Sequence, residues 1–149
     1  MGYTIPKPSR NPEQDAAMPP SPGPVLVVDD DAAVRHSLKF ALELEGLDVR
    51  LYEGGEDLLA DADLPESGCL VVDYCMPAMN GVELMDRLRG RRVDLPAILI
   101  TAKATRDLRE RAARSGYRQV LEKPLEDGLL VDSIRCALDL SLGEAVSGA

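Results

Sequence analysis

Five short, mostly apolar runs alternate with longer segments, and this alternation restricts the fold more than any other feature of the sequence. The runs are Val25–Val28, Val49–Tyr52, Cys69–Val72, Pro96–Ile100 and Gln119–Leu121. A continuous apolar run of this length is typical of a strand that is buried on both faces of a sheet. Apolar residues three and four positions apart in the intervening segments are typical of amphipathic helices. The pattern therefore predicts an α/β fold with a doubly wound, five-stranded parallel sheet flanked by five helices.

The helical spacing is clearest in the first and last of these segments. The first carries Val34, Leu38, Ala41 and Leu42, and Gly46 is a good C-terminal stop. The last carries apolar residues at the same spacing and is expected to end near Gly143. Because strands and helices follow one another without a break, we expect one domain over residues 25–142.

The two ends of the chain lack this pattern. Residues 1–24 hold seven of the 11 prolines, which predicts a flexible, proline-rich N-terminal arm that is either a passenger or packs on a partner. Residues 143–149 are a short tail. Since so few residues follow the last predicted helix, the sequence predicts a stand-alone domain without an output domain.

Composition and charge exclude several classes of function. The chain has 17 basic and 26 acidic residues and a net charge of -9, so it has no basic excess to attract nucleic acid or an anionic membrane. No apolar run approaches the roughly 18 residues of a membrane span, and the first residues lack the apolar region of a signal peptide. The three cysteines have no metal-binding spacing and suit a reducing compartment. We therefore expect a cytoplasmic protein.

Polar side chains stand at the end of four of the five predicted strands. Asp29 and Asp30 follow the first strand, Asp73 the third, Thr101 the fourth and Lys123 the fifth. Ligands of open parallel sheets bind outside the carboxyl ends of the strands, so we expect these side chains to converge. Three close carboxylates repel one another by several kcal/mol per pair, and Lys123 balances only one of them. Oxygen donors of this kind favour Mg²⁺, which commonly shares its coordination with a phosphate oxygen.

The reach of each side chain suggests its role at such a site. Asp29 and Asp30 would anchor the metal ion, and Asp73 could attack a phosphorus atom to form an aspartyl-phosphate. Thr101 and Lys123 could contact the oxygens of the same phosphoryl group. Any one of these residues is ordinary after a strand, because an aspartate there often only caps the next helix. The prediction depends on finding all of them together.

These motifs resemble those of the response-regulator receiver domains of bacterial two-component signalling. The matching stretches are Val25–Asp31, Leu70–Pro77 with Asn80–Gly81, Ile98–Ala102 and Leu121–Pro124. The resemblance implies a flavodoxin-like fold with strand order 2-1-3-4-5. It implies a signalling module rather than an enzyme with an external substrate, since such a domain catalyses only the gain and loss of its own phosphoryl group.

The resemblance also implies a role for each site residue. Asp73 is expected to be the phosphoacceptor. Asp29, Asp30, Asp73 and the backbone carbonyl of Cys75 are expected to bind Mg²⁺. Thr101 and Lys123 are expected to contact the phosphoryl group and carry the switch.

The same resemblance implies partners and one backbone feature. The phosphoryl donor would be a sensor histidine kinase or a histidine phosphotransfer protein. Output would be through protein–protein contacts, including a homodimer, or through onward phosphotransfer. The Lys123–Pro124 peptide bond is expected to be cis.

One departure from the family pattern leaves alternatives open. The family usually has Tyr or Phe three residues before the conserved lysine, where this chain has Val120. The usual coupling between the threonine and that aromatic ring must therefore be replaced. One alternative is a phosphorylation-independent interaction or dimerisation module with the same fold. A phosphatase that uses Asp73 transiently would need a substrate cap, and a phosphotransfer protein built on His36 would need a four-helix bundle instead of five strands.

Overall fold

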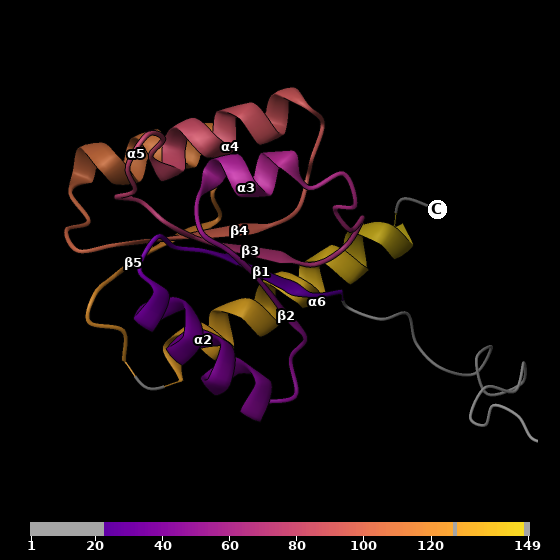
Figure 1. The fold of residues 1–149 in the computed structure, drawn as a ribbon. Coiled ribbons are helices and arrows are strands. Elements are labelled where there is room, and N and C mark those ends of the chain that lie inside the picture. Colours follow the sequence, from indigo (N-terminus) through magenta and orange to yellow (C-terminus); the bar gives the residue numbers. More distant parts are fainter. Residues whose placement is uncertain (1–22, 127, 148–149) are drawn as a thin grey trace, which may run out of the picture.

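The computed structural model describes residues 23–126 and 128–147, so most of the predicted arm over residues 1–24 lies outside the described residues (Figure 1). Strands and helices alternate throughout this part of the chain. They are β1 (Val25–Val28), α2 (Ala32–Leu44), β2 (Val49–Tyr52), α3 (Gly55–Ala60), β3 (Cys69–Asp73), α4 (Gly81–Gly90), β4 (Ala97–Thr101), α5 (Arg106–Ser115), β5 (Gln119–Glu122) and α6 (Leu129–Ser147).

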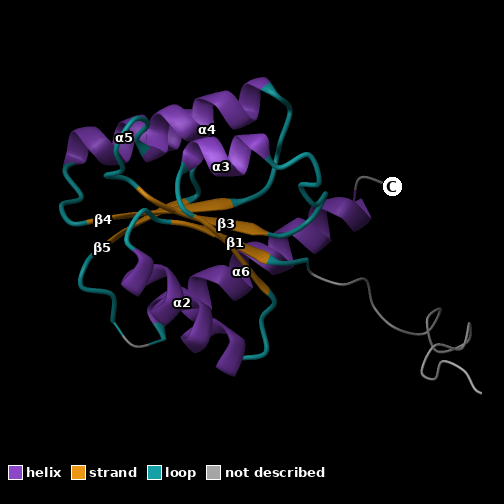
Figure 2. Cartoon of the chain, viewed as in Figure 1, coloured by secondary structure: helices purple, strands orange, loops and turns teal. Residues whose placement is uncertain are grey.

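The five strands form one sheet in the order β2-β1-β3-β4-β5, and every neighbouring pair is parallel. Helices α3, α4 and α5 cover one face of the sheet, and α2 and α6 cover the other (Figure 2). The predicted fold class and strand order are therefore confirmed. From β1 the chain first adds β2 on one side and then returns to add β3 on the other, so the order of the strands reverses between β1 and β3.

Side chains that alternate along each strand build the two halves of the core. In β1, Leu26 and Val28 pack in the cluster beneath α3, α4 and α5, whereas Val25 and Val27 pack in the cluster beneath α2 and α6. All four are at most 1% exposed. Because both faces of the strand are covered, neither alternate set can be polar, and this explains the continuous apolar runs of the sequence.

Local signals in the sequence fix where the helices begin and end. The Asp31 side chain caps α2 by accepting from the amides of Ala33 and Val34. Asn80 and Glu83 form a reciprocal capping box at the start of α4. Helix α5 ends at Gly116, which has a left-handed backbone conformation.

The last helix is longer than the sequence predicts. Helix α6 continues past Gly143 to Ser147 instead of ending near the glycine. A glycine costs a helix only about 1 kcal/mol relative to alanine, and no proline follows to stop it. In the described part of the chain, α6 and the shorter helices all lack the length and apolar character needed to cross a membrane.

Candidate functional site

Three carboxylates meet at the carboxyl ends of β1 and β3, where the strand order reverses. Oxygen atoms of Asp29, Asp30 and Asp73 all lie within 4.8 Å of one another. Asp29 and Asp73 are only 4% and 7% exposed, whereas Asp30 is exposed. The parallel sheet places them together because β1 and β3 are neighbours in matching register. This is the edge at which open α/β sheets bind their ligands.

Lys123, the residue after β5, reaches one of these carboxylates from the far side of β4. Its Nζ atom donates to Oδ1 of Asp73 at 3.0 Å. The Lys123–Pro124 bond that follows is cis, as the resemblance implies. Burial lowers the pKa of Lys123, but the hydrogen bond to Asp73 and the nearby carboxylate charges outweigh it, so the net pKa is raised. The ammonium group therefore stays charged at neutral pH.

The two buried carboxyl groups resist ionisation. Burial raises the pKa of Asp73, against the opposing effect of its hydrogen bond from Lys123, and the charge of Asp29 raises it further. Burial likewise raises the pKa of Asp29, although a hydrogen bond from the Asp31 amide opposes this rise. The raised pKa values mean that the metal-free fold does not fully compensate the negative charge of Asp29 and Asp73 when they ionise.

The donor set suits a hard divalent cation. Every candidate ligand in the cluster is an oxygen atom, and the three carboxylates exceed the single positive charge of Lys123. Mg²⁺ binds through one or two carboxylates together with water and phosphate oxygens. The residues present therefore fit the Mg²⁺ ion that the sequence predicts.

Two other predicted residues lie near the cluster without contributing to it directly. Thr101 ends β4 and is 4% exposed, but its hydroxyl pairs with the amide and carbonyl of Lys103 at 3.3 and 3.4 Å. Cys75 is exposed two residues past Asp73. The switch role of Thr101 and the metal contact of the Cys75 carbonyl stay predictions.

Comparisons with known proteins agree with this geometry. A family model described as the response regulator receiver domain matches residues 25–135. The chain belongs to the response regulator receiver family.

Individual relatives of this receiver domain cover most of its residues. The transcriptional regulatory protein FixJ of Rhizobium meliloti (strain 1021) is 36% identical over 113 residues, which are 76% of this chain and 55% of FixJ. An uncharacterized 14.6 kDa protein of Leptolyngbya boryana is 41% identical over 106 residues, which are 68% of this chain and 79% of that protein. The crystal structure of FixJ-N matches with a TM-score of 0.72 at 36% identity, over 77% of this chain and 92% of that one. The receiver domain thus spans about half the length of FixJ, the regulator it matches.

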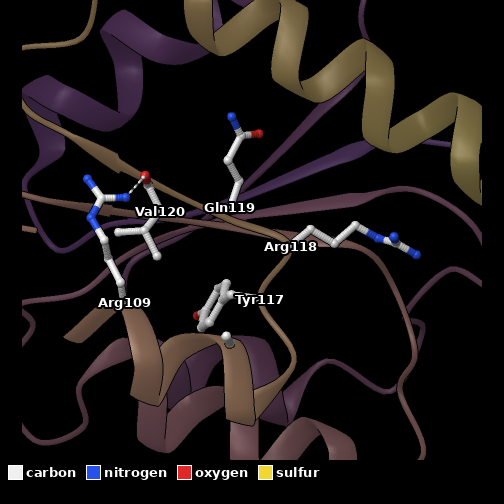
Figure 3. A pocket seen from close by; sticks show the side chains of 6 residues that line it. Arg109, Tyr117, Arg118, Gln119 and Val120 are labelled. Carbon is white, nitrogen blue, oxygen red and sulfur yellow. Dashed lines mark hydrogen bonds between the residues drawn. The ribbon is translucent and has the colours of Figure 1, made fainter. Parts of the chain in front are cut away.

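The position of the missing family aromatic opens onto a surface pocket in this receiver domain. Val120 is half-buried, and its carbonyl accepts a hydrogen bond from Nη1 of Arg109 at 3.3 Å (Figure 3). The pocket measures about 340 Å³ and lies between α5 and β5. Its lining residues are Arg109, Ala113, Tyr117, Arg118, Gln119 and Val120.

Tyr117 connects this region to the turn after Asp73, a link that the sequence did not reveal. Its side chain is 5% exposed, and its hydroxyl donates to the Gly81 carbonyl at 2.9 Å. The Gly81 amide in turn donates to the Tyr74 carbonyl at 2.9 Å. The turn that follows Asp73 is therefore fixed at its far end by a buried hydrogen bond. Tyr117 follows a helix stop and precedes a strand, so no periodic pattern marked it as buried.

Gly81 leaves no room for a side chain, and Gly81→Ala is expected to disturb the site. An added Cβ would lie 2.6 Å from Cδ1 of Leu99 and 3.2 Å from the Asp73 carbonyl oxygen. Since Leu99 is fully buried, we expect a loss of about 1–3 kcal/mol in the free energy of unfolding. Displacement of the Asp73 backbone should also slow phosphorylation by a small acyl phosphate.

Gly90 provides the matched control for that substitution. It lies at the end of the same helix, and nothing approaches an added Cβ within 4 Å. Gly90→Ala should leave phosphorylation unchanged and stabilise the helix slightly. Urea denaturation and the initial rate of modification are the measurements. Equal behaviour of the two variants would contradict the packing argument.

Arg35 is a second residue of the site that sequence reasoning missed. It is 8% exposed and donates to the Asp29 carbonyl at 2.7 Å. A signal was present, because Arg35 stands three positions before Leu38 and seven before Leu42, on the inward side of α2. A charged residue on the buried side of a helix needs a polar partner.

Proposed function

We propose that this receiver domain accepts a phosphoryl group from a phosphohistidine onto Asp73, with Mg²⁺ bound beside it. The observation that carries the proposal is the buried Asp73 carboxylate, which lies within 4.8 Å of two further carboxylates and 3.0 Å from the Lys123 ammonium. A nucleophile, a cation and a set of metal-binding oxygens are the parts that phosphoryl transfer requires. Membership of the receiver family supports the same assignment.

The transfer follows from the positions of the side chains. A carboxylate oxygen of Asp73 attacks phosphorus, and the new P–O bond forms as the P–N bond to the donor imidazole breaks. The imidazole nitrogen keeps the bonding electron pair and takes a proton from water. Lys123 already lies against Asp73, so it can stay paired with the oxygens of the transferred group.

The metal would be held by residues at the carboxyl ends of two strands, β1 and β3. Asp29, Asp30 and Asp73 are the ligands that the cluster offers, and the backbone carbonyl of Cys75 is the fourth that we propose. When bound, Mg²⁺ would neutralise negative charge on the incoming phosphoryl group and on the carboxylates.

Treatment with a small phosphoryl donor tests the proposal. The full chain is incubated with acetyl phosphate and Mg²⁺, and its intact mass is compared with that of the untreated protein. We expect a gain of one phosphoryl group, which borohydride reduction and peptide mapping should place on Asp73. A chain that stays unmodified, with and without Mg²⁺, would favour the phosphorylation-independent interaction module instead.

Signalling then depends on surfaces around the site. We propose that the new charge on Asp73 is felt by Thr101 and Lys123, which adjust the surface formed by α5, β5 and α6. A downstream protein, a second copy of the chain or an onward phosphotransfer protein would recognise that surface. We propose that the donor is a sensor histidine kinase or a histidine phosphotransfer protein, and that this chain acts in the cytoplasm. Gel filtration with and without beryllofluoride tests the homodimer.

Helix α2 exposes two apolar side chains that we propose as a contact for the donor protein. Phe40 and Leu44 are 68% and 71% exposed and stand one helical turn apart on α2, which begins directly after the acidic residues. We expect Phe40→Ala to slow phosphotransfer from a protein donor about tenfold, because exposed aromatic anchors commonly carry binding energy of this size. Acetyl phosphate should modify the variant at the wild-type rate. A slower reaction with both donors would show damage to the site rather than to docking.

A further inference from the structure

The Arg35 side chain contacts the backbone of the turn that carries Asp29 and Asp30. It belongs to α2, and Nη1 of its guanidinium donates to the Asp29 carbonyl at 2.7 Å. Among the described residues, the buried polar or charged side chains are those of Asp29, Arg35, Asp73, Thr101 and Ser133. Arg35 is thus a buried charge whose nearest polar partner is the residue that begins the acidic cluster.

The contacts of Arg35 close a small ring of hydrogen bonds around the acidic turn. The Asp31 amide donates to Oδ1 of Asp29 at 2.9 Å, and the Arg35 amide donates to the Asp31 carbonyl at 2.9 Å. The Arg35 guanidinium then returns to the Asp29 carbonyl. The Asp29 amide is fixed separately by the Tyr52 carbonyl of β2 at 3.2 Å. The turn that presents Asp29 and Asp30 is therefore held from both sides.

A charge effect and a positioning effect of Arg35 would act on a bound cation in opposite directions. The guanidinium charge repels Mg²⁺, so its removal would tighten Mg²⁺ binding if charge were decisive. The hydrogen bond to Asp29 orients the carboxylates, so its removal would weaken Mg²⁺ binding if positioning were decisive. Glu53, with Oε2 4.0 Å from Nη2 of Arg35, already offsets part of the guanidinium charge. Because the hydrogen bond from Arg35 to the Asp29 carbonyl is short and buried, we expect the positioning effect to be the larger one.

We propose that Arg35 is a positioning residue that holds the Asp29–Asp31 turn in its metal-binding arrangement. The inference rests on the proposed Mg²⁺ site. Residues that support metal ligands through hydrogen bonds commonly change metal affinity by 10-fold to 100-fold when they are replaced. Arg35→Met should therefore weaken Mg²⁺ binding about tenfold. Arg35→Lys keeps the charge and one donor, and it should fall between the wild type and Arg35→Met.

Mg²⁺ titration by calorimetry, on the full chain, tests the proposal. Arg91 supplies the matched control, because its Nη1 atom also donates to a carbonyl, that of Leu59 at 2.6 Å, but far from the site. Arg91→Met should bind Mg²⁺ as the wild type does. Modification by acetyl phosphate gives a second readout: in Arg35→Met the Mg²⁺ concentration for half-maximal rate should rise, while the rate at saturating Mg²⁺ stays near that of the wild type.

The outcomes separate this inference from the proposed function. A folded Arg35→Met that binds Mg²⁺ as tightly as the wild type, or more tightly, would overturn the positioning role. If that variant does not fold, the test passes to Arg35→Lys, for which unchanged Mg²⁺ affinity is likewise the overturning result. A wild-type chain that binds no Mg²⁺ would instead overturn the proposed metal site, and the inference with it.

Discussion

Asp73→Asn is expected to accept no phosphoryl group at all. The amide has the shape of the carboxylate but lacks the charged oxygen that attacks phosphorus. Its carbonyl oxygen can still accept the hydrogen bond that Lys123 donates to Oδ1 at 3.0 Å, so the fold should be retained. Intact-mass measurement after treatment with acetyl phosphate and Mg²⁺ should show the unmodified chain.

The matched control is an aspartate that is hydrogen-bonded away from the site. Asp61 accepts from the Tyr52 hydroxyl at 2.6 Å, and Asp61→Asn should be phosphorylated as the wild type is. Circular dichroism of both variants checks that they fold. Phosphorylation of Asp73→Asn at the wild-type rate would mean that another carboxylate takes the phosphoryl group, and the central assignment would be wrong.

Asp29→Asn should have two opposite effects, one on stability and one on metal binding. Two charges 4.8 Å apart interact by about 3 kcal/mol at an effective dielectric constant of 20, so removing one of the three carboxylates relieves repulsion in the metal-free protein. Because Lys123 offsets part of this repulsion, we expect the free energy of unfolding without Mg²⁺ to rise by about 1–2 kcal/mol. The variant should lose most of its Mg²⁺ affinity.

Added Mg²⁺ should therefore reverse the order of stability. A ligand present at 100 times its dissociation constant stabilises the folded state by about 2.7 kcal/mol. The wild type should gain this stabilisation in Mg²⁺, and Asp29→Asn should not. Urea denaturation of both proteins, with Mg²⁺ and with a chelator, measures all four values. An Asp29→Asn protein that Mg²⁺ stabilises as much as the wild type would contradict the ligand role.

The stability of the wild type and of Asp29→Asn can also be compared as a function of pH, without Mg²⁺. Burial raises the pKa of Asp29 in the folded state. Its contribution to stability is therefore complete below the pKa of the unfolded chain and is lost as pH rises through the folded pKa. Asp29→Asn lacks this loss, so its stability advantage over the wild type should grow as pH rises across that window.

Much of the fold and site could be predicted because parallel strands impose simple rules on the sequence. Strands covered on both faces must be continuously apolar, and their carboxyl ends must gather at one edge. These two rules bring Asp29, Asp30 and Asp73 together and direct Lys123 to Asp73.

Features that depend on packing rather than on pattern could not be predicted. Helical spacing placed Ala41 on the inward side of α2, but it is exposed, whereas Arg35 is buried. An alanine suits either side of a helix. The spacing of Arg35 marks it as inward-facing, but only the fold reveals the Asp29 carbonyl that serves as its buried partner. The burial of Tyr117 was equally unpredictable, because its hydrogen-bond partner Gly81 is distant in the sequence.

The site draws its parts from both halves of the chain, and this has a consequence for synthesis. Asp29 and Asp30 follow β1 and Asp73 ends β3, but the balancing ammonium of Lys123 follows β5, an edge strand and the last strand to be synthesised. A nascent chain that still lacks its final strand carries the repelling carboxylates without Lys123. The ability to accept a phosphoryl group should therefore appear only when β5 has joined the sheet. Local unfolding of β5 should abolish phosphorylation while the other four strands stay folded.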